Sequence, residues 1–393
     1  MRKVVIMDLL CMAPYYDSYL IKALNDNGLP ASLAAISFHL DLEYFKKNNI
    51  KIDPGLLNIV AQLGIKSQRL RSILKGLEYG INLLVYSVRF IFARPQVLHI
   101  QWLPMLTRSK IELLFVRWVR FLGIKIVYTV HNIMPHDTEY KYFNIFKSAY
   151  ELPHALICHT EETRVQLENN FGIRPDKIWV IPHGLMFHDH EEIDCQRARE
   201  ALDLNCTFIY VLCFGIIRPY KGIEFLLESW KKVVESCNSA KLIIAGGGDL
   251  SYIEEIRQTV IDLDLAESVV YRFGFISTKE LPLYHIASDI LVYPYKSINQ
   301  SGALLTGLSF GKAIIASRTG GFKEILADGD NAILVEYGNV EDMSKALLRL
   351  INDPGLRNSL SSSVIEKAQT DLSWNVIAQK TIECYKKVNG YFE

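Results

Sequence analysis

Short runs of apolar residues alternate along the chain with longer segments in which apolar residues recur every three or four positions. The short runs are typical of strands buried on both faces of a parallel sheet, and the longer segments are typical of connecting helices. In the first half we expect strands at residues 4–7, 31–38, 97–101, 124–130 and 178–182, and helices at 19–27, 67–92 and 111–121. This alternation predicts a doubly wound α/β sheet.

A second series of alternating elements follows a polar, acidic stretch at residues 186–195, so we expect a domain boundary near residue 187. Strands are predicted at residues 207–214, 241–245, 269–273, 289–294 and 313–317, and helices at 223–236, 252–261, 278–286, 301–311 and 374–388. We therefore predict a second doubly wound domain, and a length of 393 residues fits two domains of this size.

The charges are unevenly distributed, although the formal net charge is zero and gives no argument for nucleic acid. Residues 1–190 carry 22 basic and 16 acidic side chains, and the remainder carries 21 and 27. Between Lys66 and Lys125, eleven basic residues stand against Glu78 and Glu112 alone. Two interpretations remain open: a basic surface that faces an anionic membrane or substrate, or a solvated face.

The predicted helix at residues 67–92 is amphipathic and basic. Such a helix either lies on anionic lipid or packs as an ordinary helix. Its apolar positions are Leu70, Ile73, Leu74, Leu77, Ile81, Leu84 and Val88, and its basic neighbours are Arg69, Arg71, Lys75, Arg89 and Arg94. The longest apolar run ends at Arg89, too early for a membrane span, and the apolar start of the chain is too short for a signal peptide.

Seven scattered cysteines without metal-ligand or redox spacing indicate buried thiols in a reducing compartment. His188, His190 and Glu191 have metal-binding side chains, but nothing holds them rigid, and a solvated linker is the favoured interpretation. We therefore expect no metal site.

Polar side chains follow four predicted strands, at Gln101-Trp102, His131-Asn132, His159-Thr160 and His183-Gly184. Ligands of doubly wound sheets bind at the carboxyl ends of strands, so Gln101, Trp102, Asn132 and His159 are candidates for acceptor binding. Each histidine taken alone is more often structural, and Trp102 either stacks on a ligand or closes the core.

A predicted strand is followed by Gly215-Ile-Ile-Arg218-Pro-Tyr-Lys221-Gly222, whose glycines allow the loop to close. Two cations on this loop, together with the helix start at Ser301-Gly302, predict a diphosphate site. The chain has no G-x-x-x-x-G-K-[ST] motif, and Gly246-Gly247-Gly248-Asp249 matches no phosphate fingerprint, so a P-loop is excluded.

Several segments resemble glycosyltransferase family 4 in order and spacing: residues 214–222, 244–249, 272–275, 288–294 and 301–317. The resemblance implies a GT-B fold, in which two Rossmann-like domains face each other across a cleft. It implies that residues 1–187 with the closing helix 374–393 bind the acceptor and that residues 188–373 bind the nucleotide sugar. It also implies transfer without a metal and with retention at the anomeric carbon.

The same resemblance implies roles for individual residues. Arg218 and Lys221 would neutralise the donor diphosphate, with Gly215 in the same loop, and Ser301 and Gly302 would donate to the same phosphates. Phe275 would lie at the binding site for the nucleobase of the donor, and His131 would contact the transferred sugar. The donor would be a UDP-sugar or a GDP-sugar.

The two glutamates of the family are absent. Ile298 or Asn299 stands at the first position and Thr306 at the second, so Asn299, Gln300 and Thr306 are left to read the sugar and ribose. Gln300-Ser301-Gly302 resembles bacterial polysaccharide-assembly members, whose acceptors are often lipid diphosphates at the inner leaflet. The expected function is hexose transfer to a glycan or lipid-linked glycan, in the cytoplasm or peripheral on the inner face of the membrane. A nucleotide-sugar epimerase or hydrolase and a non-catalytic sugar-nucleotide-binding subunit remain alternatives.

Overall fold

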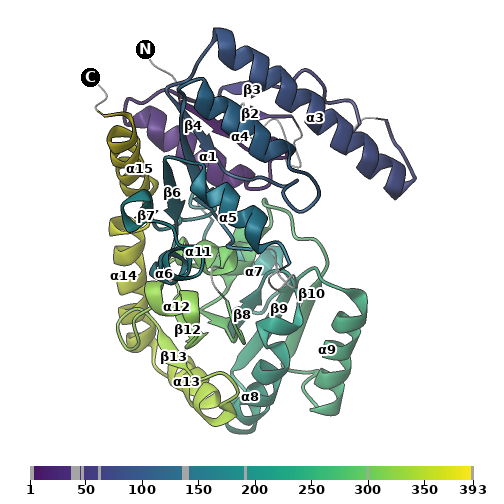
Figure 1. Ribbon diagram of the computed structural model, residues 1–393. Coiled ribbons are helices and arrows are strands. Elements are labelled where there is room, and N and C mark those ends of the chain that lie inside the picture. Colours follow the sequence, from purple (N-terminus) through teal and green to yellow (C-terminus); the bar gives the residue numbers. More distant parts are fainter. Residues whose placement is uncertain are drawn as a thin grey trace. The chain divides into compact units, whose positions relative to one another are not determined.

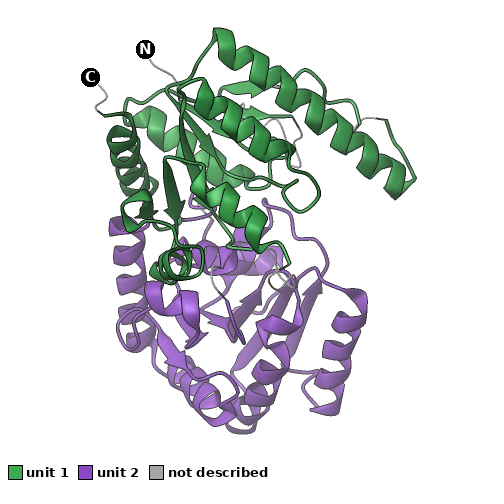
Figure 2. Ribbon diagram, in the orientation of Figure 1, with its two compact units in different colours: residues 1–184, 374–393 green, residues 185–373 purple. Residues whose placement is uncertain are grey.

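The computed structural model describes residues 4–36, 45, 48–60, 63–134, 141–189, 193–298 and 301–390. The chain divides into two compact units, unit 1 (residues 1–184 and 374–393) and unit 2 (residues 185–373) (Figure 2). Each unit holds one parallel sheet covered by helices, so the predicted α/β class is confirmed (Figure 1). The division falls between Gly184 and Leu185, three residues before the boundary between residues 187 and 188 that the sequence predicts.

The sheet of unit 1 has the order β3-β2-β1-β4-β5-β6-β7, with every neighbouring pair parallel. The middle strands are wholly buried, because their runs of valine, isoleucine and leucine are covered on both faces. The strands are β1 (Val4–Met7), β2 (Ala31–Ala35), β3 (Ile52–Pro54), β4 (Val97–Ile100), β5 (Lys125–Val130), β6 (Ala155–Cys158) and β7 (Ile178–Val180).

The predicted helices of unit 1 are present, one of them with a shifted start, and two further helices at Phe143–Glu151 and Glu161–Asn169 were not predicted. The first helix begins at Pro14, before the predicted residue 19, because proline suits the first turn of a helix. The helices are α1 (Pro14–Asp26), α3 (Gln68–Phe92), α4 (Ile111–Phe121), α5 (Phe143–Glu151), α6 (Glu161–Asn169), the 3-10 turn η1 (Pro175–Lys177) and α15 (Trp374–Asn389).

The closing helix α15 belongs to unit 1 although it follows unit 2 in the sequence. Trp374 stacks on Tyr19 of α1 at a ring distance of 5.5 Å, and Asn27 donates to Asn375 at 2.9 Å. At the other end of the helix, the Tyr385 hydroxyl lies 2.7 Å from Nδ1 of His99 in β4. These contacts fix α15 against α1 and the sheet.

The sheet of unit 2 has the order β10-β9-β8-β11-β12-β13, again wholly parallel. Alternate side chains of its strands enter two separate hydrophobic clusters, one on each face, as a doubly wound sheet requires. The strands are β8 (Ile209–Phe214), β9 (Ala240–Gly246), β10 (Val269–Phe273), β11 (Ile290–Tyr293), β12 (Ala313–Ser317) and β13 (Ile333–Val335).

Side-chain caps set several helix starts in unit 2; Asp249, for example, accepts from the N–H groups of Ser251 and Tyr252 and starts α9. The predicted helix at residues 301–311 is shorter than expected and ends at Leu308. The helices are α7 (Cys195–Ala201), the 3-10 turn η2 (Pro219–Lys221), α8 (Ile223–Ser236), α9 (Leu250–Asp262), α10 (Leu281–Ala287), α11 (Gly302–Leu308), α12 (Gly320–Ile325), α13 (Val340–Asn352) and α14 (Pro354–Thr370).

Each sheet has one point at which the strand order reverses, between β1 and β4 in unit 1 and between β8 and β11 in unit 2. In sheets of this kind the connections from the two strands run to opposite faces, and ligands bind at the carboxyl ends of the strands there. The loops after β8 and β11 contain the predicted diphosphate residues, so the topology brings them together.

Candidate functional site

Lys221 is a buried cation beside the switch point of unit 2. Lys221 is only 5% exposed. Its Nζ donates to the Tyr295 hydroxyl at 2.5 Å and lies 4.5 Å from the centre of the Tyr295 ring. Among the described residues, no carboxylate forms an ion pair with Lys221. Burial lowers the pKa of Lys221 to about 8. A buried ammonium that has no carboxylate partner among the described residues has its positive charge free to attract an anion.

The turn η2 holds Arg218 and Lys221 on one short loop. The Lys221 N–H donates to the Arg218 carbonyl at 2.9 Å, and Gly222 ends the turn in the left-handed region at φ 64°. Any larger residue at 222 would clash, because an added Cβ would lie 2.2 Å from the Pro294 carbonyl oxygen. The Arg218 side chain is exposed. The loop therefore offers one buried cation and one exposed cation.

Tyr295 accepts from Lys221, and it lies near Ser301, the residue that begins the turn into α11. Burial raises the pKa of Tyr295 well above its usual value, and the neighbouring Ser301 lowers it. Ser301 is buried, and its Oγ accepts from the Leu304 N–H at 3.2 Å as the cap of α11. Gly302 leaves open space, since an added Cβ would meet nothing within 4 Å. Sequence reasoning missed Tyr295; its signal was an aromatic hydroxyl one residue beyond the Pro that ends β11.

The remaining predicted donor residues lie in different settings. Thr306 is buried, and its hydroxyl donates to the Gly302 carbonyl within α11 at 2.8 Å. That hydroxyl proton is therefore already in a hydrogen bond within the helix. Phe275 follows β10 and is 91% exposed. Gln300 and Asn299 lie outside the described residues. The structure thus brings together Gly215, Lys221, Tyr295 and Ser301, and leaves Phe275 on the loop of an edge strand.

Glycines pack the loops that follow β8, β9 and β10 against one another. The Gly215 N–H donates to the Ala245 carbonyl at 3.0 Å, and the Gly274 N–H donates to the Gly246 carbonyl at 3.1 Å. A Cβ on Gly246 would lie 2.0 Å from the Gly215 carbonyl oxygen, and one on Gly215 would lie 2.9 Å from Nζ of Lys221. The glycine run at 246–248 therefore has a packing role behind the cationic loop, which its sequence did not reveal.

In unit 1, polar side chains from the carboxyl ends of β4, β5 and β6 form one cluster. His131 Nε2 lies 2.9 Å from Gln101 Oε1, and His131 Nδ1 lies 3.3 Å from Nε2 of His159. Trp102 stacks on His131 at a ring distance of 5.1 Å and an angle of 7°. Of the predicted acceptor residues only Asn132 stands apart, with an exposed side chain.

Two further aromatic rings close this cluster, and the sequence did not indicate either. Tyr16, at the start of α1, makes edge contacts with His131, His159 and His183. Trp374 of α15 packs on Tyr16 at 5.2 Å. They come from opposite ends of the chain, so no local pattern joins them to the strand ends.

Burial keeps these imidazoles neutral. It lowers the pKa of His131 well below its usual value, that of His159 to about 3 and that of His183 to about 4. His159 Nδ1 lies 2.9 Å from the Ile181 carbonyl and donates to it, which leaves His159 Nε2 as an acceptor.

No group of metal-ligating side chains occurs within the described ranges. His190 and Glu191, from the candidate set with His188, lie outside those ranges. Within the same part of the chain, no helix combines the length and the apolar character needed to cross a bilayer.

The sequence matches two family models, one described as Glycosyltransferase Family 4 over residues 54–186 and one as Glycosyl transferases group 1 over residues 209–353. Together with its two-sheet fold, these matches place the chain in the family 4 glycosyltransferases of GT-B fold.

Individual relatives agree with this assignment. An uncharacterized glycosyltransferase of Methanocaldococcus jannaschii is 28% identical over 231 residues, 58% of this chain and 56% of the relative. A D-inositol 3-phosphate glycosyltransferase of Acidothermus cellulolyticus is 25% identical over 238 residues, 59% of this chain and 52% of the relative. The matches thus span about half the length of these curated relatives. The solved structure of HepE from Anabaena, in complex with UDP and glucose, has the same fold, with a TM-score of 0.74 at 15% identity over 98% of this chain and all of that one.

Proposed function

We propose that this protein transfers a hexose from a nucleoside-diphosphate sugar to a glycan or lipid-linked glycan acceptor. The observation that carries the proposal is Lys221, a buried cation that has no carboxylate partner among the described residues and stands at the strand switch point. A diphosphate supplies the missing negative charge, and Arg218 on the same turn adds a second cation. HepE, which has this fold, was solved with UDP-glucose, and this supports a uridine donor.

The chemistry requires little beyond charge stabilisation and positioning. As the bond between the anomeric carbon and the diphosphate oxygen breaks, negative charge grows on the leaving nucleoside diphosphate. Lys221 and Arg218 would stabilise that charge, which a divalent metal does in other enzymes, and we propose transfer without a metal. Retention at the anomeric carbon is proposed from the family assignment.

Nucleoside diphosphates test the donor site directly. UDP or GDP is expected to raise the melting temperature of the purified protein, because a ligand that binds only the native state stabilises it. Arg218→Ala is expected to weaken that binding by about 10- to 100-fold in titration calorimetry, the loss of a charge-assisted contact. Arg197, an exposed residue of α7, gives the matched control Arg197→Ala. No binding of UDP, GDP or ADP, with no difference in Arg218→Ala, would disprove the proposed donor site.

His131 tests the proposed sugar contact. Its neutral ring, held by Gln101 and covered by Trp102, suits a hydrogen bond to a sugar hydroxyl rather than an ionic contact. His131→Ala is expected to lower kcat/KM by about 100-fold, as loss of one preorganised polar contact does. UDP affinity should remain within about twofold, since the proposed diphosphate residues lie in unit 2. Unchanged turnover in His131→Ala would refute this role.

Thr306, where the family has a glutamate, favours a second candidate, a non-catalytic subunit that binds a sugar nucleotide. Its hydroxyl proton is already donated to Gly302, and it has no carboxylate to hold a ribose. Product analysis separates the candidates. Transfer to an added acceptor supports the glycosyltransferase, release or epimerisation of the sugar with donor alone supports a hydrolase or epimerase, and binding without any product supports the subunit.

We propose that the reaction takes place in the cytoplasm, because all seven cysteines are free thiols in the described structure, as is usual in a reducing compartment. Four of these thiols, Cys11, Cys158, Cys213 and Cys384, are buried in the cores of the two units.

A further inference from the structure

Helix α3, the long helix labelled in Figure 1, exposes a continuous apolar stripe along its whole length. The stripe residues are 41–64% exposed except Ile91 at 40% and Phe92 at 84%, and they recur at three and four positions. They are Leu70, Ile73, Leu77, Ile81, Leu84, Val88, Ile91 and Phe92. A helix of 25 residues extends over about 37 Å, so the α3 stripe is far longer than a single exposed side chain.

The opposite face of α3 already packs against unit 1, so the stripe is not the side that the fold buries. Tyr79, Leu83, Tyr86 and Phe90 lie on that inner face and are at most 3% exposed. The α3 stripe therefore lies on the outer face, where no described segment of the protein covers it. One face of the helix therefore packs in the ordinary way, and the described residues leave the other face uncovered.

Apolar neighbours widen the α3 stripe on both sides. On one side, Glu78 Oε1 accepts from the N–H groups of Ile59 and Val60, and this holds the preceding loop against the helix. That loop exposes Leu56 by 65% and Ile59 by 50%.

On the other side lies α4, whose Trp118 Nε1 donates to the Ser87 carbonyl of α3 at 3.1 Å. The same helix leaves Leu114 61% exposed and Phe121 80% exposed. The apolar surface thus spans a loop and two helices that are tied together by hydrogen bonds.

Within residues 66–125 the exposed charge around the stripe has one sign, and outside this segment Asp53 pairs with Arg89 of α3 at 3.1 Å. All residues from Lys66 to Lys125 are described, and their only two carboxylates point inward: Glu112 accepts from the Tyr79 hydroxyl and the Met105 N–H, and Glu78 holds the loop. The exposed side chains of this segment therefore include no carboxylate. The exposed cations are Lys66, Arg69, Arg71, Arg94, Arg108, Lys110, Arg117 and Arg120.

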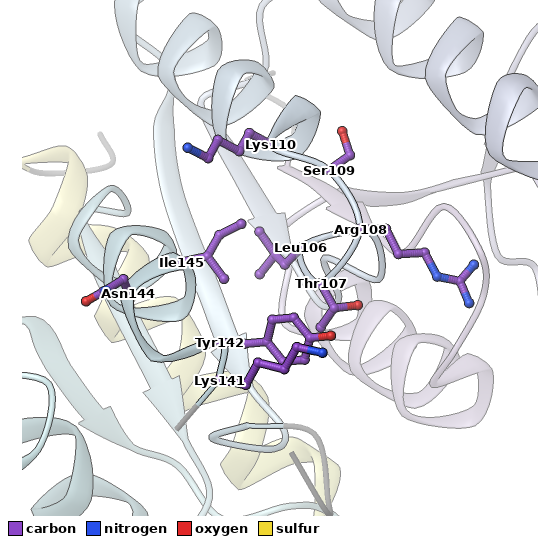
Figure 3. A pocket seen from close by; sticks show the side chains of 9 residues that line it. All are labelled: Leu106, Thr107, Arg108, Ser109, Lys110, Lys141, Tyr142, Asn144 and Ile145. Atoms are coloured by element: carbon purple, nitrogen blue, oxygen red, sulfur yellow. The ribbon is translucent and has the colours of Figure 1, made fainter. Parts of the chain in front are cut away.

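Two pockets of unit 1 beside these helices are also lined by cations and by no carboxylate. One, of about 340 Å³, includes Arg71, Lys75 and Arg108 in its lining. The other, of about 390 Å³, includes Arg108, Lys110 and Lys141, with the amide of Asn144 (Figure 3). In the close view, the Arg108 side chain points away from the other labelled residues, which is consistent with its place between the two pockets. Both pockets suit anionic groups.

We propose that the α3 stripe and its surrounding cations dock unit 1 on the surface of a bilayer that contains anionic phospholipid. An apolar stripe flanked by lysine and arginine is the pattern of a helix that lies in the plane of a membrane interface. The apolar side chains enter the acyl boundary, and the cations meet the phosphate groups. A second copy of the chain is a poorer occupant, because a symmetric contact would place the same eight cations opposite one another.

Vesicle flotation tests the docking. The intact protein is expected to float with vesicles of phosphatidylcholine and phosphatidylglycerol, and to remain in solution with phosphatidylcholine alone. Added salt should weaken the binding, because exposed charges are screened. Leu77→Gln with Leu84→Gln should weaken binding to the anionic vesicles by tenfold or more through lost apolar burial. Arg69→Gln with Arg117→Gln should weaken it by about tenfold or more through lost surface charge.

Matched pairs in unit 2 serve as controls. Leu250 and Ile261 of α9 are 81% and 63% exposed, so Leu250→Gln with Ile261→Gln should leave flotation unchanged. Arg197→Gln with Lys345→Gln is the charge control. Equal binding to neutral vesicles, or unchanged binding by the stripe variant, contradicts the proposal. So does dimerisation in gel filtration that the stripe variant abolishes. UDP calorimetry on each variant tests the proposed donor site separately, because the membrane docking does not depend on that site.

Discussion

Replacing Lys221 by methionine is expected to lower kcat/KM for the nucleotide sugar by about 10²- to 10³-fold, the effect of removing one preorganised donor to a developing negative charge. Methionine keeps the unbranched stem, so the loss reports the ammonium rather than the packing. Steady-state kinetics and UDP calorimetry measure it. Lys345→Met on the exposed face of α13 is the matched control, and activity within twofold of wild type in Lys221→Met would disprove the role.

The same lysine predicts how donor affinity depends on pH. Burial lowers the pKa of Lys221 to about 8, and a bound diphosphate favours the ammonium and raises that pKa again. Donor affinity is therefore expected to be flat below about pH 7 and to fall by up to tenfold per pH unit above about pH 8, with proton uptake on binding. Calorimetry across buffers of different ionisation enthalpy measures the proton, and Lys221→Met should abolish this dependence.

As pH rises, the folding stability is expected to increase while the donor affinity decreases. The folded pKa of Lys221 lies below the value of 10.5 for an unperturbed lysine, so below about pH 8 the native state carries the cost of a buried charge. That cost diminishes as pH rises from about 8 to 10.5. Lys221→Met should therefore raise the melting temperature at pH 7 while it removes activity, which is the behaviour of a residue kept for function rather than stability.

Gly246→Ala is expected to destabilise unit 2 by about 2–5 kcal/mol, from backbone strain and from a clash. Gly246 has φ +142°, and an added Cβ would lie 2.0 Å from the Gly215 carbonyl oxygen, which is backbone and cannot rotate away. The melting temperature should fall by about 5–15 °C. UDP affinity should fall as well, because Gly215 belongs to the loop that holds Lys221.

Gly329→Ala separates strain from clash. Gly329 also has a positive φ, +78°, but nothing lies within 4 Å of its added Cβ. Gly329→Ala should lower the free energy of unfolding by only about 1 kcal/mol. Equal destabilisation by the two alanines, measured by thermal unfolding, would show that the contact between Gly246 and Gly215 contributes nothing.

The elements of the fold were largely predictable, because strands buried on both faces and amphipathic helices have distinct periods. The predicted strands and the closing helix α15 occur where the pattern indicated, whereas the short strands β3 and β13 and the helices α5, α6 and α13 were not predicted. Boundaries were less accurate, since caps such as Asp249 and the proline at the start of α1 set them locally. The contacts of α15 with α1 depend on side chains hundreds of residues apart, and no local pattern encodes them.

The candidate site divides in the same way. The sequence by itself determined the types of group at the strand ends: two cations in the loop after β8, a serine before α11, and histidines after β5 and β6. It also determined the apolar stripe and basic neighbours of α3. The tertiary structure decided that Lys221 is buried against Tyr295 without a described carboxylate partner, that Tyr16 and Trp374 close the histidine cluster, and that Glu78 and Glu112 turn inward. Periodicity along a chain specifies which face of an element is apolar. Burial and pairing depend on what the fold brings against that face.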